Sequence, residues 1–203
     1  MAPPHLTCVF HSSPTIVALL KAPAGAGLAG ELLIECAPLP SLGFTLSLET
    51  PINYPGLPGL LGGVDVVSLA HATDLLPAPI VLAPGAAATP GAARAALTRL
   101  AQGTERPRPI TLLVPMGYAP VLGAALAVAT QFTLAWDVTE FPHAELLDFS
   151  RWLEHEQLLD RSNFAGLIAY ASQPVDAAHV QRLTILLEPL ATPAYPAGVV
   201  ALA

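Results

Sequence analysis

The chain has 203 residues, of which 53% are hydrophobic and 11% are charged, and its net charge is −7. This composition excludes a disordered chain, because enough apolar surface is present to offset the entropy lost on ordering. Lys21 is the only lysine and basic residues do not cluster, so we expect no direct nucleic-acid binding.

The chain opens with a strand pattern followed by a helix start. Leu6–Phe10 is predicted to be a strand. Ser13 and Pro14 suit the N-cap and the first position of a helix that ends at Lys21, because a hydroxyl satisfies a free backbone N–H there and proline lacks one. Glu31–Cys36 is apolar enough to be a second, buried strand.

Short elements continue to residue 142. We predict strands at Phe44–Leu48, Val64–Leu69, Ile80–Leu82 and Ile110–Val114, and helices at Ala70–Leu76, Ala92–Ala101 and Val121–Thr130. The hydrophobic pattern of Thr133–Val138 is ambiguous and does not decide its secondary structure. Alternating strands and helices favour the α/β class, with a mixed or parallel sheet and flanking helices.

The residues after 142 have a helical period. Leucines and aromatic residues recur at helical spacing in His143–Leu159 and again in Val175–Leu187. Trp152 shares a face with Phe149 and Leu159, so we predict that it is a buried anchor. We therefore expect an α/β domain at 1–142 and a helical segment at 143–203 packed on it.

A long uncharged run raises the question of a membrane span. Residues 109–136 carry no charge, and this length could cross a bilayer. Pro115 and Pro120 would break such a helix, and alanine contributes little to insertion. A buried strand followed by a buried helix explains the same run, so we expect no membrane span. A membrane-attached protein is the alternative.

Cys8, His11 and Cys36 form the one grouping that could bind zinc. Three ligands without a C-x₂-C pair make an incomplete site, and both cysteines lie in apolar strand patterns where a thiol packs as a small hydrophobe. We therefore predict no metal and no cofactor. Two cysteines form no disulfide framework and the amino terminus has no secretory pattern, which predicts a cytoplasmic location.

Two polar groupings stand out in the sequence. The turn from His11 to Pro14 places hydroxyls before a helix, where an anion or thiolate would be stabilised; an ordinary N-cap is the alternative. The acids between Asp137 and Asp160 are interpreted as a solvated helix face. No phosphate loop, nucleophile elbow, G-x-G-x-x-G or H-E-x-x-H motif is present, so no catalytic residue is predicted.

Two stretches resemble glutathione-transferase-like domains. The strand, Ser-Ser-Pro helix start and second strand in residues 6–36, and the segment 56–76, are similar to the thioredoxin-like half of those domains. Residues 151–159 and 175–198 are similar to their helical half. The variant resembled is that of aminoacyl-tRNA synthetase appendages and elongation-factor gamma subunits.

This resemblance implies a set of ligand-binding residues. Ser12 or Ser13 would lie where the family activates the glutathione thiol, Pro58 would precede a hairpin, and Ser68 would match the glutamyl-binding serine. Val67 stands where the family commonly has an acid, which leaves the ammonium of the tripeptide without its partner. The resemblance therefore implies a binding domain more than a transferase.

Two function hypotheses follow from the sequence. The first is a non-catalytic protein-interaction domain, a glutathione-transferase-like scaffold of the translation machinery that binds other proteins or forms a dimer. The second is a small α/β enzyme or ligand-binding protein with its site at the strand ends.

Overall fold

A parallel β-sheet forms the centre of the molecule. The computed structural model describes residues 6–25, 27–39, 41–48, 69–83, 89–102, 109–139, 148, 151–152, 155, 163–187 and 198–201. The seven strands lie in the order β3-β2-β4-β1-β5-β6-β7, and every neighbouring pair is parallel. They are β1 (Leu6–His11), β2 (Leu32–Glu35), β3 (Ile80–Leu82), β4 (Ile110–Pro115), β5 (Gln131–Asp137), β6 (Phe164–Ala171) and β7 (Gly198–Ala201).

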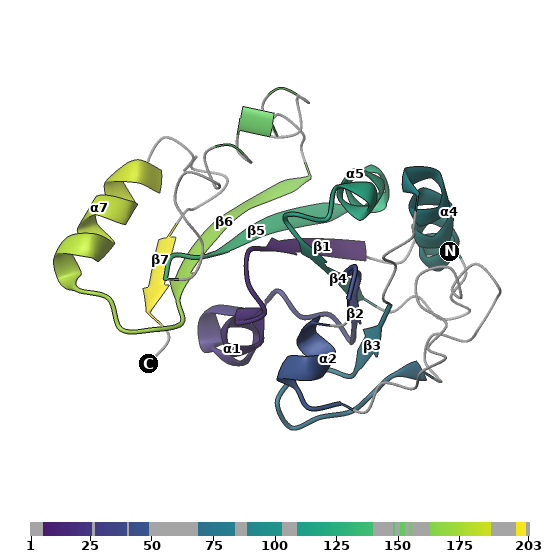
Figure 1. Ribbon diagram of the computed structural model, residues 1–203, viewed down its shortest axis with the longest axis horizontal. Helices are drawn as coiled ribbons and strands as arrows, with labels where there is room; N and C mark the ends of the chain where they lie inside the picture. The colour runs from purple at the N-terminus through teal and green to yellow at the C-terminus, as the bar shows by residue number, and fades with distance from the viewer. Residues whose placement is uncertain are drawn as a thin grey trace.

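Helices cover both faces of this sheet, as Figure 1 shows. The helices are α1 (Ile16–Lys21), α2 (Ser41–Thr45), α4 (Pro90–Gln102), α5 (Ala119–Val128) and α7 (Ala177–Leu187), with a 3-10 turn at Pro23–Gly25. One face of the sheet packs against α4 and α5, and the other against α1 and α2. Helix α7 contacts the edge strand β7.

The alternation of side chains along each strand divides the core between these two faces. On β1, Cys8 and Phe10 belong to the α4/α5 side and Val9 to the α1/α2 side. Because both faces are covered, β1 and β4 read as continuous apolar runs, as expected of a central parallel sheet. Trp136 on β5 is 1% exposed and is the largest fully buried side chain among the described residues.

The α/β class with a parallel sheet and flanking helices is therefore confirmed. The strands predicted near residues 6, 31, 80 and 110 are present, and so are the helices predicted over 92–101, 121–130 and 175–187. The uncharged run 109–136 folds as β4, α5 and β5, as a buried strand followed by a helix. No helix in the described part of the chain has the length and apolar character needed to cross a membrane.

The expectation of a helical carboxyl-terminal part was wrong. Phe164–Ala171 forms β6, which pairs with β5, and Gly198–Ala201 forms β7. The run Phe164–Ala171 is almost continuously buried, as a strand between two neighbouring strands requires. Such a strand has no alternation of apolar and polar residues, so the usual strand pattern is missing from its sequence. The boundary at residue 142 stays a prediction, although β6 and β7 belong to the same sheet as β1.

Three local predictions were also wrong. Phe44–Leu48 is not a strand: its first two residues end α2, which Glu35 caps, and the rest is a turn. Residues 70–76 form turns and an isolated bridge from His71 to Ile80 instead of a helix. Trp152 is 38% exposed, so it is not a buried anchor.

Candidate functional site

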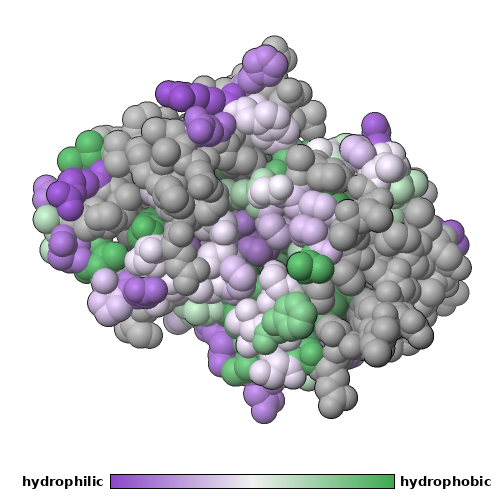
Figure 2. Space-filling view, in the orientation of Figure 1, coloured by the Kyte–Doolittle hydropathy of each residue, from purple (hydrophilic) through white to green (hydrophobic). Residues whose placement is uncertain are grey.

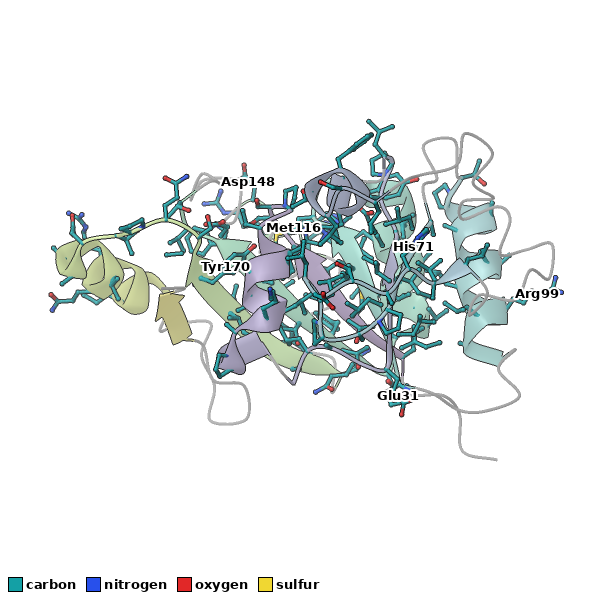
Figure 3. The ribbon with its side chains drawn as sticks, turned by 90° about the horizontal axis from the view of Figure 1, so that it is seen from below. Glu31, His71, Arg99, Met116, Asp148 and Tyr170 are labelled. Atoms are coloured by element: carbon teal, nitrogen blue, oxygen red, sulfur yellow. The ribbon has the colours of Figure 1, made fainter. Side chains whose placement is uncertain are left out.

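The carboxyl ends of the central strands meet where the chain connections change direction. From β1 the chain continues to β2 on one side, and from β4 it crosses to β5 on the other. Ligands of open α/β sheets bind outside the carboxyl ends of strands at such a switch point. Figure 3 shows Met116 and Tyr170 toward this edge of the sheet and Glu31 at the opposite edge.

The connection between β1 and α1 is short and tightly held. It consists of four residues, Ser12 to Thr15, between His11 and Ile16. The backbone N–H of Ser12 donates to Ala135 O at 3.1 Å, which continues the pairing with β5 beyond the strand. Thr15 is the N-cap of α1, but its hydroxyl makes no cap hydrogen bond. The N-cap therefore lies two residues after Ser13, the cap that the sequence predicted.

Asp137, at the end of β5, holds this connection in place. Its Oδ2 accepts a hydrogen bond from the Thr15 hydroxyl at 2.5 Å, and its backbone N–H donates to Ser12 Oγ at 2.8 Å. Its Oδ1 accepts from the backbone N–H of Thr139 at 2.9 Å and from the Thr139 hydroxyl at 2.6 Å. Asp137 is 0% exposed, so it is no part of the solvated helix face predicted from the sequence.

The network extends to β6 and favours a charged carboxylate. Tyr170 OH lies 3.1 Å from Thr15 Oγ1, and Ser172 Oγ lies 2.9 Å from Thr139 Oγ1. Burial alone would raise the pKa of Asp137, but hydrogen bonds from Ser172, Thr139 and Thr15 outweigh it and lower the pKa below its ordinary value. The centre of the candidate site is thus a buried negative charge surrounded by hydroxyl groups.

Two further polar side chains lie on the α1/α2 side of the sheet. His11 is 2% exposed; its Nδ1 lies 3.0 Å from Ser13 O, while its buried Nε2 has no partner. Burial lowers the pKa of His11 to about 4. Glu35 is 1% exposed, and its Oε1 accepts from the Ser41 hydroxyl and the Leu42 N–H, while its Oε2 has no partner. Burial raises the pKa of Glu35 against these hydrogen bonds.

The cysteines do not join His11. Cys8 and Cys36 are both fully buried, on the α4/α5 face, whereas His11 alternates to the other face of β1. Burial raises the pKa of Cys36 to about 12 and that of Cys8 well above its usual range, so both are thiols. No group of three potential metal ligands occurs among the described residues.

Of the four ligand-binding residues implied by the glutathione-transferase resemblance, the structure describes two. Ser12 and Ser13 lie in the β1–α1 connection, where Ser12 Oγ accepts from Asp137 N–H and Ser13 Oγ lies 3.3 Å from Thr15 N. Pro58 and Ser68 lie outside the described residues. A ligand on any of the four stays a prediction. Sequence reasoning missed Asp137; its position directly after an apolar run was the available signal.

This connection does not have the composition of a phosphate loop. Such a loop needs glycines, whose backbone N–H groups surround the phosphates, and a lysine that reaches them, in the pattern G-x-x-x-x-G-K-[ST]. Residues 12–15 are Ser, Ser, Pro and Thr. In place of a lysine, the buried carboxylate of Asp137 approaches the connection, and it would repel an anion.

Comparison with known proteins was informative only at the level of structure. No family model matches the chain, and no curated protein matches it. MinD in the MinC:MinD cell division protein complex of Aquifex aeolicus is similar at a TM-score of 0.65 and 17% identity, over 98% of this chain and 82% of that one. A plasmid partition protein from Borrelia burgdorferi has a TM-score of 0.65 and 11% identity, over 100% and 91%.

A third similar structure was solved with nucleotide. Cobyrinic acid a,c-diamide synthase from Mycobacterium smegmatis, with bound ADP and magnesium, has a TM-score of 0.60 and 16% identity over 95% of this chain and 85% of that one. The similarity to glutathione-transferase-like domains is thus wrong, and so is the translation scaffold inferred from it, because short apolar helices and a Ser-Ser-Pro turn recur in unrelated folds. The chain shares the fold of these three structures.

Proposed function

We propose that this chain is a ParA/MinD-like protein that associates with a protein partner, in the first instance a second copy of itself, and whose β1–α1 connection does not hold nucleotide phosphates. The observation that carries the proposal is the Asp137 network. The carboxylate accepts the Thr15 hydroxyl, the backbone N–H of Asp137 occupies Ser12 Oγ, and the carboxylate places a negative charge beside the connection where a phosphate would lie. A cytoplasmic location belongs to the same proposal, and two buried thiols favour it.

Exposed apolar side chains support association. Leu39 is 66% exposed and Phe44, on α2, is 69% exposed, and no charged residue occurs between Cys36 and Leu48. Figure 2 shows apolar side chains gathered over α2. Scattered apolar residues are normal on a surface, but an uncharged apolar group on an acidic protein provides contact area without repulsion between like charges.

Nucleotide binding is the competing candidate function. It is favoured by the printed descriptions of similar structures, which include a synthase with bound ADP and magnesium and a McdA variant in complex with ATP. If the chain binds ATP, a different arrangement of the connection must release Thr15 from Asp137. The two candidates therefore predict opposite results in one titration.

The test combines nucleotide binding with size measurement. A fluorescent ATP analogue is titrated with Mg²⁺ into the full chain, and we expect no saturable binding. Light scattering after size exclusion is then compared for the wild type, Phe44→Ser and, as the control, Ile185→Ser, an equally apolar position that is 60% exposed on α7. We expect Phe44→Ser to shift the protein toward monomer and Ile185→Ser to leave its size unchanged.

Two results contradict the proposal. Saturable binding of the analogue at one equivalent would favour the ATPase candidate, and the Thr15→Val variant would then show whether the connection takes part. A wild type that stays monomeric at all concentrations, with and without nucleotide, would exclude a second copy as the partner.

A further inference from the structure

Glu35 is a buried carboxyl group of which only one oxygen is hydrogen-bonded. It ends β2, and its side chain is 1% exposed. Oε1 accepts a hydrogen bond from the Ser41 hydroxyl at 2.8 Å and one from the Leu42 N–H at 2.9 Å. Oε2 is also buried and has no hydrogen-bond partner among the described residues. Since buried polar atoms are nearly always paired, Oε2 requires an explanation.

The neighbours of Glu35 are apolar. In the sheet Glu35 is level with Leu82 of β3 and Leu113 of β4, and both leucines belong to the α1/α2 side of the core. Leu33, two residues before Glu35 on β2, belongs to the same side, and so does the fully buried Leu42 of α2. These side chains are hydrocarbon and donate no hydrogen bond. A negative charge on Oε2 is therefore neither paired nor hydrated in this arrangement.

The described elements around Glu35 supply no compensating cation. Helix α2 and strands β3 and β4 carry no charged or titratable side chain. The titratable side chains of the other neighbouring segments are Lys21 of α1, His11 of β1, Cys36 after β2, His71 and Asp74 before β3, and Asp137 and Tyr170 beyond β1. Within the described part of the chain, none of them forms an ion pair with Glu35.

The hydrogen bonds of Glu35 hold the start of α2 and the two exposed apolar side chains next to it. Phe44 lies on α2, and Leu39 precedes α2 and is joined to it by a hydrogen bond from Ser41 N–H to Leu39 O at 2.8 Å. A helix of five residues has no stability of its own in water. The position of α2 therefore depends on the cap from Glu35 and on the burial of Leu42.

We propose that Glu35 is a pH-dependent switch for α2: its neutral carboxyl group keeps α2 closed on the sheet, and its ionisation opens α2 locally and removes the surface of Leu39 and Phe44 from association. In the neutral form the proton lies on Oε2, and Oε1 still accepts both hydrogen bonds. A buried O–H without an acceptor is less costly than a buried charge, whereas opening α2 exposes both carboxylate oxygens to water. The effect on association rests on the proposed function; the opening of α2 does not.

The direction of the switch follows from the linkage between protonation and closing. Burial raises the pKa of Glu35 in the closed form. The closed form therefore binds the proton more tightly than the open form. Closing is complete below the ordinary carboxyl pKa and weakens as the pH rises toward the raised value, by up to about tenfold per pH unit.

The first measurement is hydrogen exchange at the Leu42 amide in the full chain, from about pH 5 to about pH 8 and corrected for the intrinsic exchange rate. We expect the protection of Leu42 to fall as the pH rises, and that of Val9 on the central strand β1 to show no such fall. Glu35→Gln keeps an oxygen for both donors and cannot ionise, so the protection of Leu42 becomes independent of pH. Glu31→Gln removes a nearby exposed acid and, as the matched control, retains the fall.

Two further measurements keep the test independent of that variant. Light scattering after size exclusion follows association over the same pH range, and we expect wild type to shift toward monomer as the pH rises and Glu35→Gln to keep one size. Ser41→Ala removes a donor to the carboxylate and leaves Glu35 in place. This change raises the pKa of Glu35 further, so the fall in the protection of Leu42 extends to higher pH than in wild type.

Three results overturn the proposal. They are equal protection profiles of Leu42 in wild type and Glu35→Gln, a fall in Ser41→Ala that ends at the same pH as in wild type, and a wild-type dimer that keeps its size while α2 opens. A wild type that is monomeric at every pH, with the expected profile at Leu42, supports the opening of α2 and refutes the proposed self-association instead.

Discussion

Replacing Asp137 with asparagine tests the polar network directly. Asparagine keeps an oxygen for Thr139 but presents an NH₂ group to Thr15, where Oδ2 accepted a hydrogen bond at 2.5 Å. A hydrogen bond to a charged group contributes about 1.5–3 kcal/mol. We therefore expect Asp137→Asn to lower the free energy of unfolding by about 2 kcal/mol, and the melting temperature by about 4–8 °C for a chain of this size.

The assay is urea denaturation, with a double-mutant cycle between Asp137→Asn and Thr15→Val. A coupling energy of about 1–2 kcal/mol assigns the loss to this contact. Asp148→Asn is the control, because Asp148 makes an exposed ion pair with Arg151 and its loss should cost less than about 0.5 kcal/mol.

The pH dependence gives a second check. The pKa of Asp137 is lowered by folding, so its stabilisation is present above the ordinary carboxyl pKa and is lost as pH falls through the lower folded value. The difference between wild type and Asp137→Asn should therefore shrink in acid. If Asp137→Asn is as stable as Asp148→Asn at pH 7, the network does not hold the connection and the reasoning is refuted.

Three other predictions concern the core. Trp136→Ala should cost about 3–5 kcal/mol, since Trp136 is 1% exposed, whereas Trp152→Ala should cost far less at 38% exposure; equal melting temperatures for the two variants would contradict this. His11 is held neutral with a pKa of about 4, so its contribution to stability should be complete above the unfolded value of about 6.5 and decline as pH falls toward 4; a His11→Phe variant measured by urea denaturation should lack that decline. Cys8 and Cys36 are buried thiols with raised pKa values, so a thiol reagent should label neither in the native protein and both in urea; fast native labelling would show that the sheet face is open.

The sequence predicted elements that have a local cause. β1 and β4 are continuous apolar runs, and such runs predict buried strands. Helix α4 has a strong helical composition and was predicted to within two residues at its start. Phe44–Leu48 failed because its helix depends on a cap from Glu35, nine residues before Phe44, which no local pattern contains.

The candidate site could be predicted only in part. The connection at Ser12 and Ser13 was identified because hydroxyls precede a helix. Asp137 was not, because its partner Thr15 is 122 residues away in the sequence and only the strand order brings them together. The assignment of this region to a known family was wrong for a related reason: a strand, a turn and a helix are shared by many α/β folds, and the connections between them determine which fold forms.

That sequence separation has a consequence for the order of folding. The bond from Thr15 to Asp137 closes a loop of more than half the chain, and it needs β1 and β5 to be aligned before either group finds the other. Closing such a loop is entropically costly, so the bond forms after local contacts. A change at Asp137 should then accelerate unfolding while leaving the folding rate nearly unchanged, so the network governs how long the folded molecule persists.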